Sequence, residues 1–478
     1  MQRSPDMTPD GAPPDPGAIF DLQKAACRAD PGVPYARRHD ALKALEDLLV
    51  DNQQAIAEAI SLDFGNRSVH ETRLLEIFPT VSGLSHARRK LKKWMRPQRR
   101  HVSLWFAGAS NRVIPQPKGV VGIISPWNYP LQLALSPLTN ALAAGNRCMI
   151  KMATNSQRLC RLLDRLISEV FPADYVAVLP GVSAGDFTAL PFDHLVFTGS
   201  PRTGREVMKT AAAHLTPVTL ELGGKSPTII ADDIDIDTAA ERILYIKYMN
   251  AGQTCVAPDY LFLPRHRLDA FVAKAKSAVR RRYPRLDSPD YTAIIDDRAY
   301  RRLMAVLDDA REKGANLVNL LPGAEPDPVS RKIPPTLALN VTEDMFLMQE
   351  EIFGPILPVK PYRELDAVIT YINDRPRPLA LYLFSNDRRV QDRIIAGTLS
   401  GGVGINDCAI HVAQHDMPFG GIGNSGMGQY HGYEGFLEFS KLRPIFSQAP
   451  MTATALMAPP YGKTFERIYR LMTRWRGL

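Results

Sequence analysis

The chain has 478 residues, of which 45% are apolar and 23% charged. This length suits two or more domains and the composition is globular, so a disordered protein and a single small binding module are excluded. The 58 Lys and Arg residues exceed the 50 Asp and Glu residues, for a net charge of +8. The excess is densest at residues 88–100, where interspersed apolar side chains favour a solvated helix face over a nucleic-acid surface.

Membrane-spanning and disulfide-stabilised proteins also fit poorly. No apolar run approaches the length of a transmembrane helix, and the first residues lack the apolar segment of a secretion signal, so we expect a cytoplasmic protein. The cysteines lack CxxC spacing, which argues against a disulfide framework and a structural zinc site, and we expect no metal. The five are Cys27, Cys148, Cys160, Cys255 and Cys408.

In chain order, the Pro- and Asp-rich residues 1–16 predict a disordered tail. Apolar residues at helical spacing then predict two or more amphipathic helices over residues 35–63 and 71–94. From residue 120, short apolar runs alternate with helical stretches, which is the pattern of a parallel sheet with crossover helices. Strands are expected at 120–124, 148–151, 175–179, 194–197 and 218–220, and helices at 131–144, 157–170 and 204–213.

A second α/β stretch is expected over residues 226–400, followed by a Gly-rich tract at 401–428. Its strands are expected at 228–230, 260–263 and 356–360, and its helices at 236–249 and 265–282. The last predicted element is an amphipathic helix over residues 463–476, with an apolar and an Arg-rich face. It is typical of a membrane-surface helix, or of a helix that covers a cavity entrance or another subunit.

Two motifs contain candidate reactive side chains. Cys255 ends NAGQTC (250–255), where Gly252 allows a tight turn that would expose the thiol. The alternative is an inert, buried cysteine. Glu221 opens ELGGKSP (221–227) at a strand end, and the two glycines would let a ligand approach the backbone. The alternative is a surface glutamate in a turn.

Three further motifs are weak on their own. In SPWNYP (125–130), Asn128 follows a buried strand and is a candidate hydrogen-bond donor, or else a helix-capping residue. FTGSPRTG (197–204) resembles a phosphate-binding turn but lacks the GxGxxG spacing. QEEIFGP (349–355) has no specific meaning in isolation.

Taken together, PWNYP, FTGS, ELGGKSP, GQTC, EEIFGP and PFGGIGNSGMG resemble, in this order, the aldehyde dehydrogenase superfamily over residues 20–445. NAGQTCVAPDY and GNSGMGQYHG look like the class 3 group, and SKLRP and PPYG are most similar to bacterial coniferyl aldehyde dehydrogenases. The resemblance implies an α/β fold with a Rossmann-like cofactor domain, an α/β catalytic domain and a small bridging and oligomerisation element. It also implies a homodimer.

The resemblance places these parts along the chain. The cofactor-binding domain is expected at residues 17–101 and 115–221, and the catalytic domain at 222–401. Residues 102–114 and 402–448 would form the bridging and oligomerisation element, and 449–478 a C-terminal amphipathic extension.

The implied reaction is NAD(P)-dependent oxidation of an aldehyde to the acid, through a thiohemiacetal and a thioester on Cys255. The Asn128 amide and the Cys255 backbone N–H are the implied oxyanion donors. Glu221 is the implied general base for hydrolysis, a residue that coenzyme A-acylating branches generally lack. The implied cofactor-binding residues are Ser125, Trp127, Lys151, Thr154, Gly199, Ser200, Glu351 and Phe353.

Thr154 stands where the family commonly has a glutamate that would repel a 2′-phosphate. We therefore expect NADP to be accepted at least as well as NAD, unless Thr154 only caps the next helix. The implied substrate channel favours aromatic or medium-chain aldehydes. Its residues are Tyr129, Tyr245, Met249, Ala409 and Ala413.

Two other functions remain open. One is a catalytically idle member of the fold with a structural or binding role, against which the presence of Cys255, Glu221 and Asn128 speaks. The other is a nucleic-acid or membrane-surface binder attracted by the charge of +8. We expect a small-molecule aldehyde as the partner, no nucleic acid and no transmembrane segment, with peripheral membrane contact allowed through the C-terminal helix.

Overall fold

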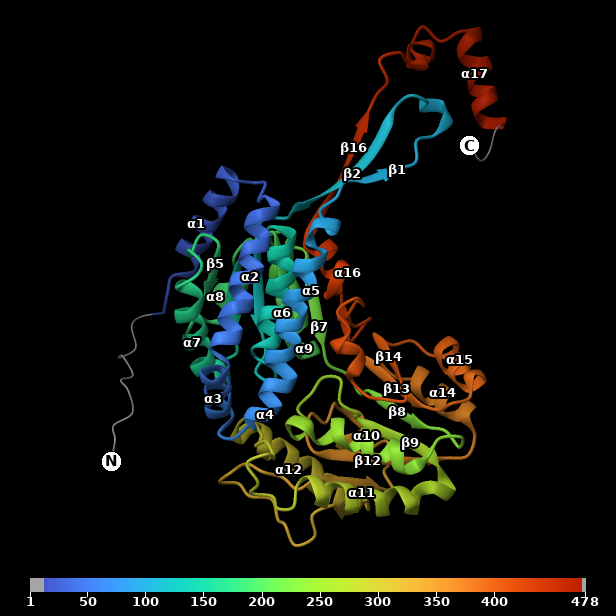
Figure 1. Cartoon of the computed structure of the whole chain (residues 1–478). Coiled ribbons are helices and arrows are strands. Elements are labelled where there is room, and N and C mark those ends of the chain that lie inside the picture. The colour runs from blue at the N-terminus through green and yellow to red at the C-terminus, as the bar shows by residue number, and fades with distance from the viewer. Residues whose placement is uncertain (1–12, 475–478) are drawn as a thin grey trace.

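The computed structural model describes residues 13–474 and contains three sheets (Figure 1). Most of the predicted tail, residues 1–12, lies outside the described residues. Helix α1 (Pro16–Ala29) begins directly after it, and the Asp15 side chain caps the helix by accepting the Gly17 N–H at 2.9 Å. The mixed α/β fold class that the sequence predicts is confirmed.

The first large sheet has the strand order β15-β7-β6-β3-β4-β5, with β3 to β7 parallel. Its strands are β3 (Val120–Ser125), β4 (Arg147–Met152), β5 (Val176–Val178), β6 (His194–Gly199), β7 (Val218–Leu222) and the short β15 (Gly426–Met427). β3 and β4 are buried throughout, because helices cover both faces. The chain leaves β3 for β4 on one side and returns as β6 on the other. The carboxyl ends of β3 and β6 therefore flank a topological switch point, where open α/β sheets bind ligands.

Helix α6 (Gln132–Ala144) packs against β3 and β4, and α2 (Tyr35–Asp51) and α5 (Phe78–Trp94) pack over α6. The opposite face of the sheet packs against α1 and α9 (Pro201–Ala212). Leu91 and Trp94 of α5 are buried while the adjacent lysines are exposed, which confirms the solvated helix face. This half also contains α3 (Gln53–Phe64), α4 (Val69–Thr72), the π-helix η1 (Arg73–Ile77), η3 (Thr154–Ser156), α7 (Gln157–Ser168) and α8 (Ala184–Thr188).

The second large sheet has the order β10-β11-β12-β9-β8-β13-β14, and only β10 runs antiparallel to its neighbour. Its strands are β8 (Pro227–Ile230), β9 (Tyr260–Pro264), β10 (Asn316–Asn319), β11 (Thr336–Leu339), β12 (Ile356–Tyr362), β13 (Ala380–Phe384) and β14 (Gly402–Ile405). Its helices are α10 (Ile236–Tyr248), η4 (Met249–Gly252), η5 (Arg265–Arg267), α11 (Leu268–Arg282), α12 (Asp297–Glu312), α13 (Phe346–Gln349), α14 (Leu365–Asn373) and α15 (Arg388–Gly397).

The third sheet is antiparallel and forms an arm that extends away from the two larger sheets (Figure 1). It consists of β1 (Gln98–Arg100), β2 (Ser110–Pro117) and β16 (Ser440–Ser447), with η2 (Leu104–Phe106) between β1 and β2. η6 (Ile410–Ala413) and α16 (Gly432–Glu438) precede the arm, and η7 (Ala453–Met457) and α17 (Lys463–Arg474) lie at its far end. Within residues 13–474, no helix is long and apolar enough to cross a membrane.

The structure differs from three expected boundaries. Residues 98–100 pair with β2 in the arm, although we expected them in the cofactor-binding part. β14 pairs with β13, so residues 402–405 extend the second large sheet and not the bridging element. β15 pairs with β7 and so returns residues 426–427 to the first sheet. In each case, strand pairing with a segment elsewhere in the chain determines which sheet the residues join.

Candidate active site

The turn after β3, residues 125–130, lies at the switch point. Ser125 closes it by donating its hydroxyl to the Pro130 carbonyl at 3.1 Å. Asn128 is buried, and its Nδ2 donates to the Gln253 carbonyl oxygen at 3.2 Å. Asn128 does not cap the next helix, because the Glu76 carboxylate accepts the Leu131 N–H at 2.7 Å and the Gln132 N–H at 3.2 Å. The Asn128 amide is therefore held beside the loop that carries Cys255.

That loop begins in η4, where the backbone is left-handed at Asn250 (φ 52°), Ala251 (φ 50°) and Gly252 (φ 75°). Such conformations are costly for residues with a Cβ and cluster at functional sites. A Cβ on Gly252 would lie 2.3 Å from the Gly354 carbonyl oxygen, so only glycine fits there. The loop consequently packs against the EEIFGP segment.

Hydrogen bonds fix the residues just before the thiol. The buried Gln253 side chain donates to the Ala293 carbonyl at 3.0 Å and accepts the Ile295 N–H at 3.0 Å. The Tyr129 and Thr254 hydroxyls are 2.6 Å apart, which joins this loop to the turn after β3. Part of the Cys255 surface remains accessible, so the residue is not the fully buried cysteine of the alternative interpretation.

Cys255 lies where two cavities meet. The first, of about 470 Å³, opens at the switch point between the two large sheets. Its lining includes eight of the residues predicted from sequence, namely Trp127, Asn128, Gly199, Ser200, Glu221, Cys255, Glu351 and Phe353. The second, of about 340 Å³, also reaches Cys255 and is almost wholly apolar.

The first cavity fits a dinucleotide. Gly199 and Ser200 stand at the N-terminus of α9, whose first N–H groups and positive dipole end favour phosphate. Trp127 and Phe353 form an edge-to-face aromatic pair with ring centroids 5.4 Å apart. A Cβ on Gly223 would lie 2.1 Å from a carboxylate oxygen of Glu351, so the glycine lets this acid pack against the cavity wall. The Thr198 hydroxyl is buried and has no hydrogen-bond partner among residues 13–474, which leaves it free for a ligand.

The second cavity contains all five predicted channel residues, Tyr129, Tyr245, Met249, Ala409 and Ala413. Aromatic and aliphatic side chains form most of its wall. Phe78, Leu74 and Ile410 are about half exposed and lie in the lining, which indicates an apolar entrance. Such walls favour the burial of an apolar substrate.

Burial raises the pKa of the three acidic groups in the site. It raises the pKa of Cys255 to about 12, and the nearby Glu351 and Glu221 carboxylates raise it further. Burial and then the Glu438 charge raise the pKa of Glu221 well above its usual value, and the Gly421 N–H offsets this only in part. Burial raises the pKa of Glu351 to about 8. Cys255 and Glu351 are therefore mostly protonated at neutral pH without ligand. Glu221 is buried and is not the surface glutamate of the alternative interpretation.

Three predicted cofactor-binding residues do not line the first cavity. Ser125 is buried in its own turn, as described above. Lys151 and Thr154 lie at the carboxyl end of β4, further along the same sheet edge. Thr154 does not cap α7, because the Asp63 carboxylate accepts the Arg158 and Leu159 N–H groups at 3.1 Å.

Sequence reasoning missed several lining residues. Phe419 and Leu133 border both cavities, and Arg202 and Arg302 border the first. Arg202 directly follows the Ser200–Pro201 pair in a motif already singled out, so its charge beside a helix N-terminus was the available signal. Phe419 comes from the Gly-rich tract, whose path no local pattern specifies.

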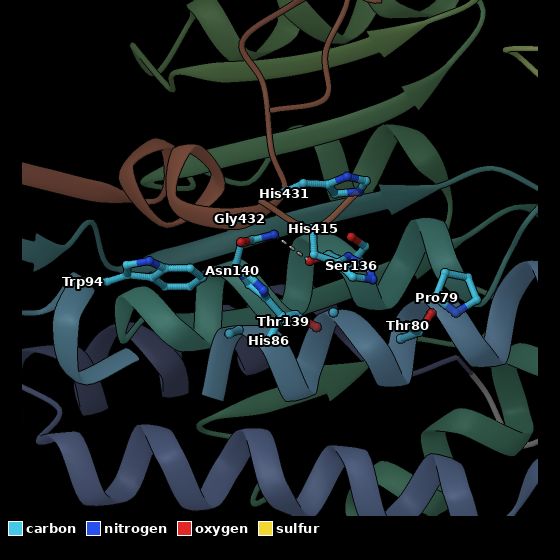
Figure 2. A pocket seen from close by; sticks show the side chains of 12 residues that line it. Pro79, Thr80, His86, Trp94, Ser136, Thr139, Asn140, His415, His431 and Gly432 are labelled. Atoms are coloured by element: carbon cyan, nitrogen blue, oxygen red, sulfur yellow. Dashed lines mark hydrogen bonds between the residues drawn. The ribbon is translucent and has the colours of Figure 1, made fainter. Parts of the chain in front are cut away.

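A third cavity, of about 20 Å³, lies between α5, α6 and residues 415–432 (Figure 2). It has room for about one water molecule. His431 lines both this cavity and the apolar one, and burial lowers its pKa to about 3, so its ring is neutral. No cysteine lines this small cavity, and in the described part of the chain no group of three or more His, Cys, Asp or Glu residues is placed to hold a metal ion.

Known proteins resemble this chain over nearly its whole length. The sequence profile of the aldehyde dehydrogenase family matches residues 13–445. A probable coniferyl aldehyde dehydrogenase of Pseudomonas aeruginosa is 53% identical over 96% of each chain, and a coniferyl aldehyde dehydrogenase of a Pseudomonas species is 45% identical over 89% of each. The substrate-bound state of Staphylococcus aureus AldH superposes with a TM-score of 0.90 at 37% identity, over 95% of this chain and 99% of the other. The chain therefore belongs to the aldehyde dehydrogenase family and is an NAD(P)-dependent oxidoreductase that acts on aldehydes.

Proposed function

We propose that this protein oxidises aromatic aldehydes of the coniferaldehyde type to their acids, with Cys255 as the nucleophile. The observation that carries this proposal is the place of Cys255 at the junction between a dinucleotide-sized cavity and an apolar cavity. The names of the two Pseudomonas relatives support the aromatic class. Medium-chain aldehydes fit the same apolar walls less specifically.

In the first step, the Cys255 thiol gives its proton to solvent and its sulfur attacks the aldehyde carbon. The C–S bond forms as the C=O π bond opens, so the carbonyl oxygen becomes an oxyanion. The Asn128 amide and the Cys255 backbone N–H donate to that oxyanion. When bound, NAD(P) would supply the acceptor for the hydride that leaves the substrate carbon. The acyl group then remains on Cys255 as a thioester.

In the second step, Glu221 takes a proton from a water molecule while the water oxygen bonds to the acyl carbon. The C–S bond then breaks, and the acid and the free thiolate are released. Glu221 suits this role because its side chain lines the cavity, both its oxygens are buried, and no other side chain within residues 13–474 is hydrogen-bonded to them. The burial that raises its pKa also makes its charged form a stronger base.

The residues that would hold the dinucleotide follow from the first cavity. Gly199, Ser200 and the start of α9 would bind the pyrophosphate. Glu351 and Phe353 would hold the nicotinamide ribose and ring, and Trp127 packs behind Phe353. Lys151 and Thr154 would lie beside the adenosine ribose.

We also propose that NADP is used at least as well as NAD. Thr154 is exposed, and its hydroxyl contacts only Asn155 Oδ1, at 3.4 Å, among the described residues. The site then has a neutral hydroxyl in place of the glutamate that would repel a 2′-phosphate. In Thr154→Glu, the ratio of kcat/KM for NADP to that for NAD should fall at least tenfold. The exposed Thr210→Glu on α9 should leave the ratio unchanged.

For the assembly, we propose a homodimer formed through the arm. Support comes from Leu104, Phe106 and Phe446, which are about half exposed on the arm, and from α17, which has no buried residue. The Arg-rich face of α17 would also allow contact with an anionic membrane. Light scattering at several concentrations tests the dimer, and flotation with anionic vesicles tests the membrane contact. Trp475, part of the predicted apolar face, lies outside the described residues.

The substrate proposal is tested by absorbance at 340 nm. Coniferaldehyde, benzaldehyde and hexanal are each compared with NAD and NADP, for the wild type and for Cys255→Ala. We expect the highest kcat/KM with coniferaldehyde and no product with Cys255→Ala. A clear preference for hexanal would contradict the aromatic class.

A further inference from the structure

A buried ion pair lies directly behind the turn that carries Asn128. Arg67, between α3 and α4, and Glu76, in η1, are joined by Arg67 Nη1 and Glu76 Oε1 at 2.6 Å, and both side chains are fully buried. The Arg67 guanidinium lies over the rings of Phe64 and Tyr129, 5.1 and 4.9 Å from their centroids. Neither residue belongs to a motif that the sequence suggested, and neither borders the two large cavities.

The two residues form hydrogen bonds with the turn in its middle and at its end. Arg67 Nη1 donates to the Asn128 carbonyl oxygen at 3.1 Å. Glu76 Oε2 accepts the Leu131 and Gln132 N–H groups, where α6 begins. The backbone from which the Asn128 side chain projects is therefore fixed at the Asn128 carbonyl and, three residues further on, at the Leu131 N–H.

Further hydrogen bonds connect the Arg67–Glu76 pair and the turn to the Cys255 loop. The Asn250 side chain donates to the Asn128 carbonyl at 3.1 Å and to the Gln253 carbonyl at 3.2 Å. Tyr129, which packs on Arg67, bonds the Thr254 hydroxyl. The ion pair, the oxyanion turn and the nucleophile loop therefore form one connected unit.

A contribution to folding stability does not by itself explain why this ion pair is buried here. Arg67 Nε and Nη2 are buried without hydrogen-bond partners in the described part of the chain. Desolvation of two charges is often not repaid by their attraction, and an apolar pair of similar volume is often as stable or more so. The irregular π-helix that presents Glu76 is also typical of functional segments.

We propose that Arg67 and Glu76 are positioning residues for the oxidation, which hold the Asn128 amide in line with the oxyanion formed at Cys255. This inference rests on the proposed role of Asn128. A displacement of a catalytic group by about 1 Å can lower a rate about a hundredfold. Loss of the hydrogen bonds from Arg67 and Glu76 to the turn should therefore lower kcat by about tenfold to a hundredfold. Neither residue borders the two large cavities, so dinucleotide affinity and the KM for aldehyde should stay within about twofold of wild type.

The decisive variant replaces both charges, R67M/E76L, because apolar replacement preserves packing while it removes the three hydrogen bonds that the pair makes to the turn and to the start of α6. Its kcat, KM and NADPH affinity by fluorescence are measured in the full chain, alone and combined with Asn128→Ala. A matched control is R88M/E46L, which removes a partly buried Arg–Glu pair between α5 and α2. The control should keep wild-type kcat.

If the pair acts through Asn128, R67M/E76L lowers kcat in the wild-type background and has little further effect in Asn128→Ala. Wild-type kcat in folded R67M/E76L, or an equal loss in both backgrounds, would overturn this inference alone. Wild-type kcat in Asn128→Ala would overturn the oxyanion role and this inference with it.

Should R67M/E76L not fold, Arg67→Lys serves in its place. Lysine keeps the charge opposite Glu76 but cannot reproduce the planar fork that also reaches the Asn128 carbonyl. The same kcat loss at unchanged KM is expected, and wild-type kcat in this variant would contradict the proposal.

Discussion

Replacement of Glu221 by glutamine separates the two halves of the proposed reaction. The side chain is buried, and burial raises its pKa well above the usual value, so the site favours the protonated form, which glutamine closely matches in shape and charge. The fold and dinucleotide binding should be kept. The first half does not need the base, so one equivalent of NAD(P)H per active site should form in a rapid burst.

The second half should then nearly stop. Loss of a general base lowers a rate by about 10²–10⁴-fold, so steady-state turnover of Glu221→Gln should fall by that factor. Stopped-flow absorbance at 340 nm measures both phases, with the exposed Glu206→Gln as control. A variant without a burst would place Glu221 before the thioester, and a variant with unchanged turnover would refute its role.

The same variant has an effect on stability with a defined sign. Because the pKa of Glu221 is raised in the folded state, that state holds a proton which the unfolded state releases above pH 4.5. Wild-type stability should therefore decrease by about 1.4 kcal/mol for each pH unit from 4.5 towards the folded-state pKa. Glu221→Gln should lack this part of the slope. Identical pH dependence of the unfolding free energy in the two proteins would contradict the buried, weakly acidic state of Glu221.

Further predictions concern neighbouring residues. With the pKa of Cys255 near 12, its alkylation by iodoacetamide in the free protein should keep accelerating up to pH 10, as followed by peptide mass spectrometry, and a plateau near pH 8 would contradict this. Asn128→Ala should lower kcat by about 10²–10³-fold at unchanged NADPH affinity, and a loss of affinity alone would point to a binding role. Gly223→Ala should displace Glu351 and weaken NADPH binding in a fluorescence titration, whereas Gly32→Ala, with open space around it, should not; equal affinities would show that the wall yields.

Much of the site was predictable because its residues follow apolar strands. Asn128 follows closely on a strand that the apolar run at 120–124 predicts, and the carboxyl ends of neighbouring parallel strands meet at one edge of a sheet. Gly252, three residues before Cys255, likewise predicts a turn with a left-handed backbone conformation. Local patterns of this kind place side chains near a site without a knowledge of the whole fold.

The remainder depends on contacts between distant segments. Ser125 was expected at the cofactor, but its hydroxyl turns back onto Pro130, which no local pattern specifies. Arg67 follows one predicted helix and Glu76 lies near the start of the next, where charged residues are normally exposed. Their burial depends on contacts with the distant turn after β3, which no local pattern specifies. The arm strands are partly exposed and interrupted by proline, so they lack the apolar runs by which the buried strands were recognised.

Identification of the acylated residue tests directly whether Cys255 is the nucleophile. Glu221→Gln is mixed with coniferaldehyde and NADP, quenched in acid at the end of the burst, digested and examined by mass spectrometry. We predict the mass of the feruloyl group on the peptide that carries Cys255, in an amount that matches the NADPH formed. NADPH formation with no acyl group on Cys255, or with the acyl group on another cysteine, would contradict the central claim.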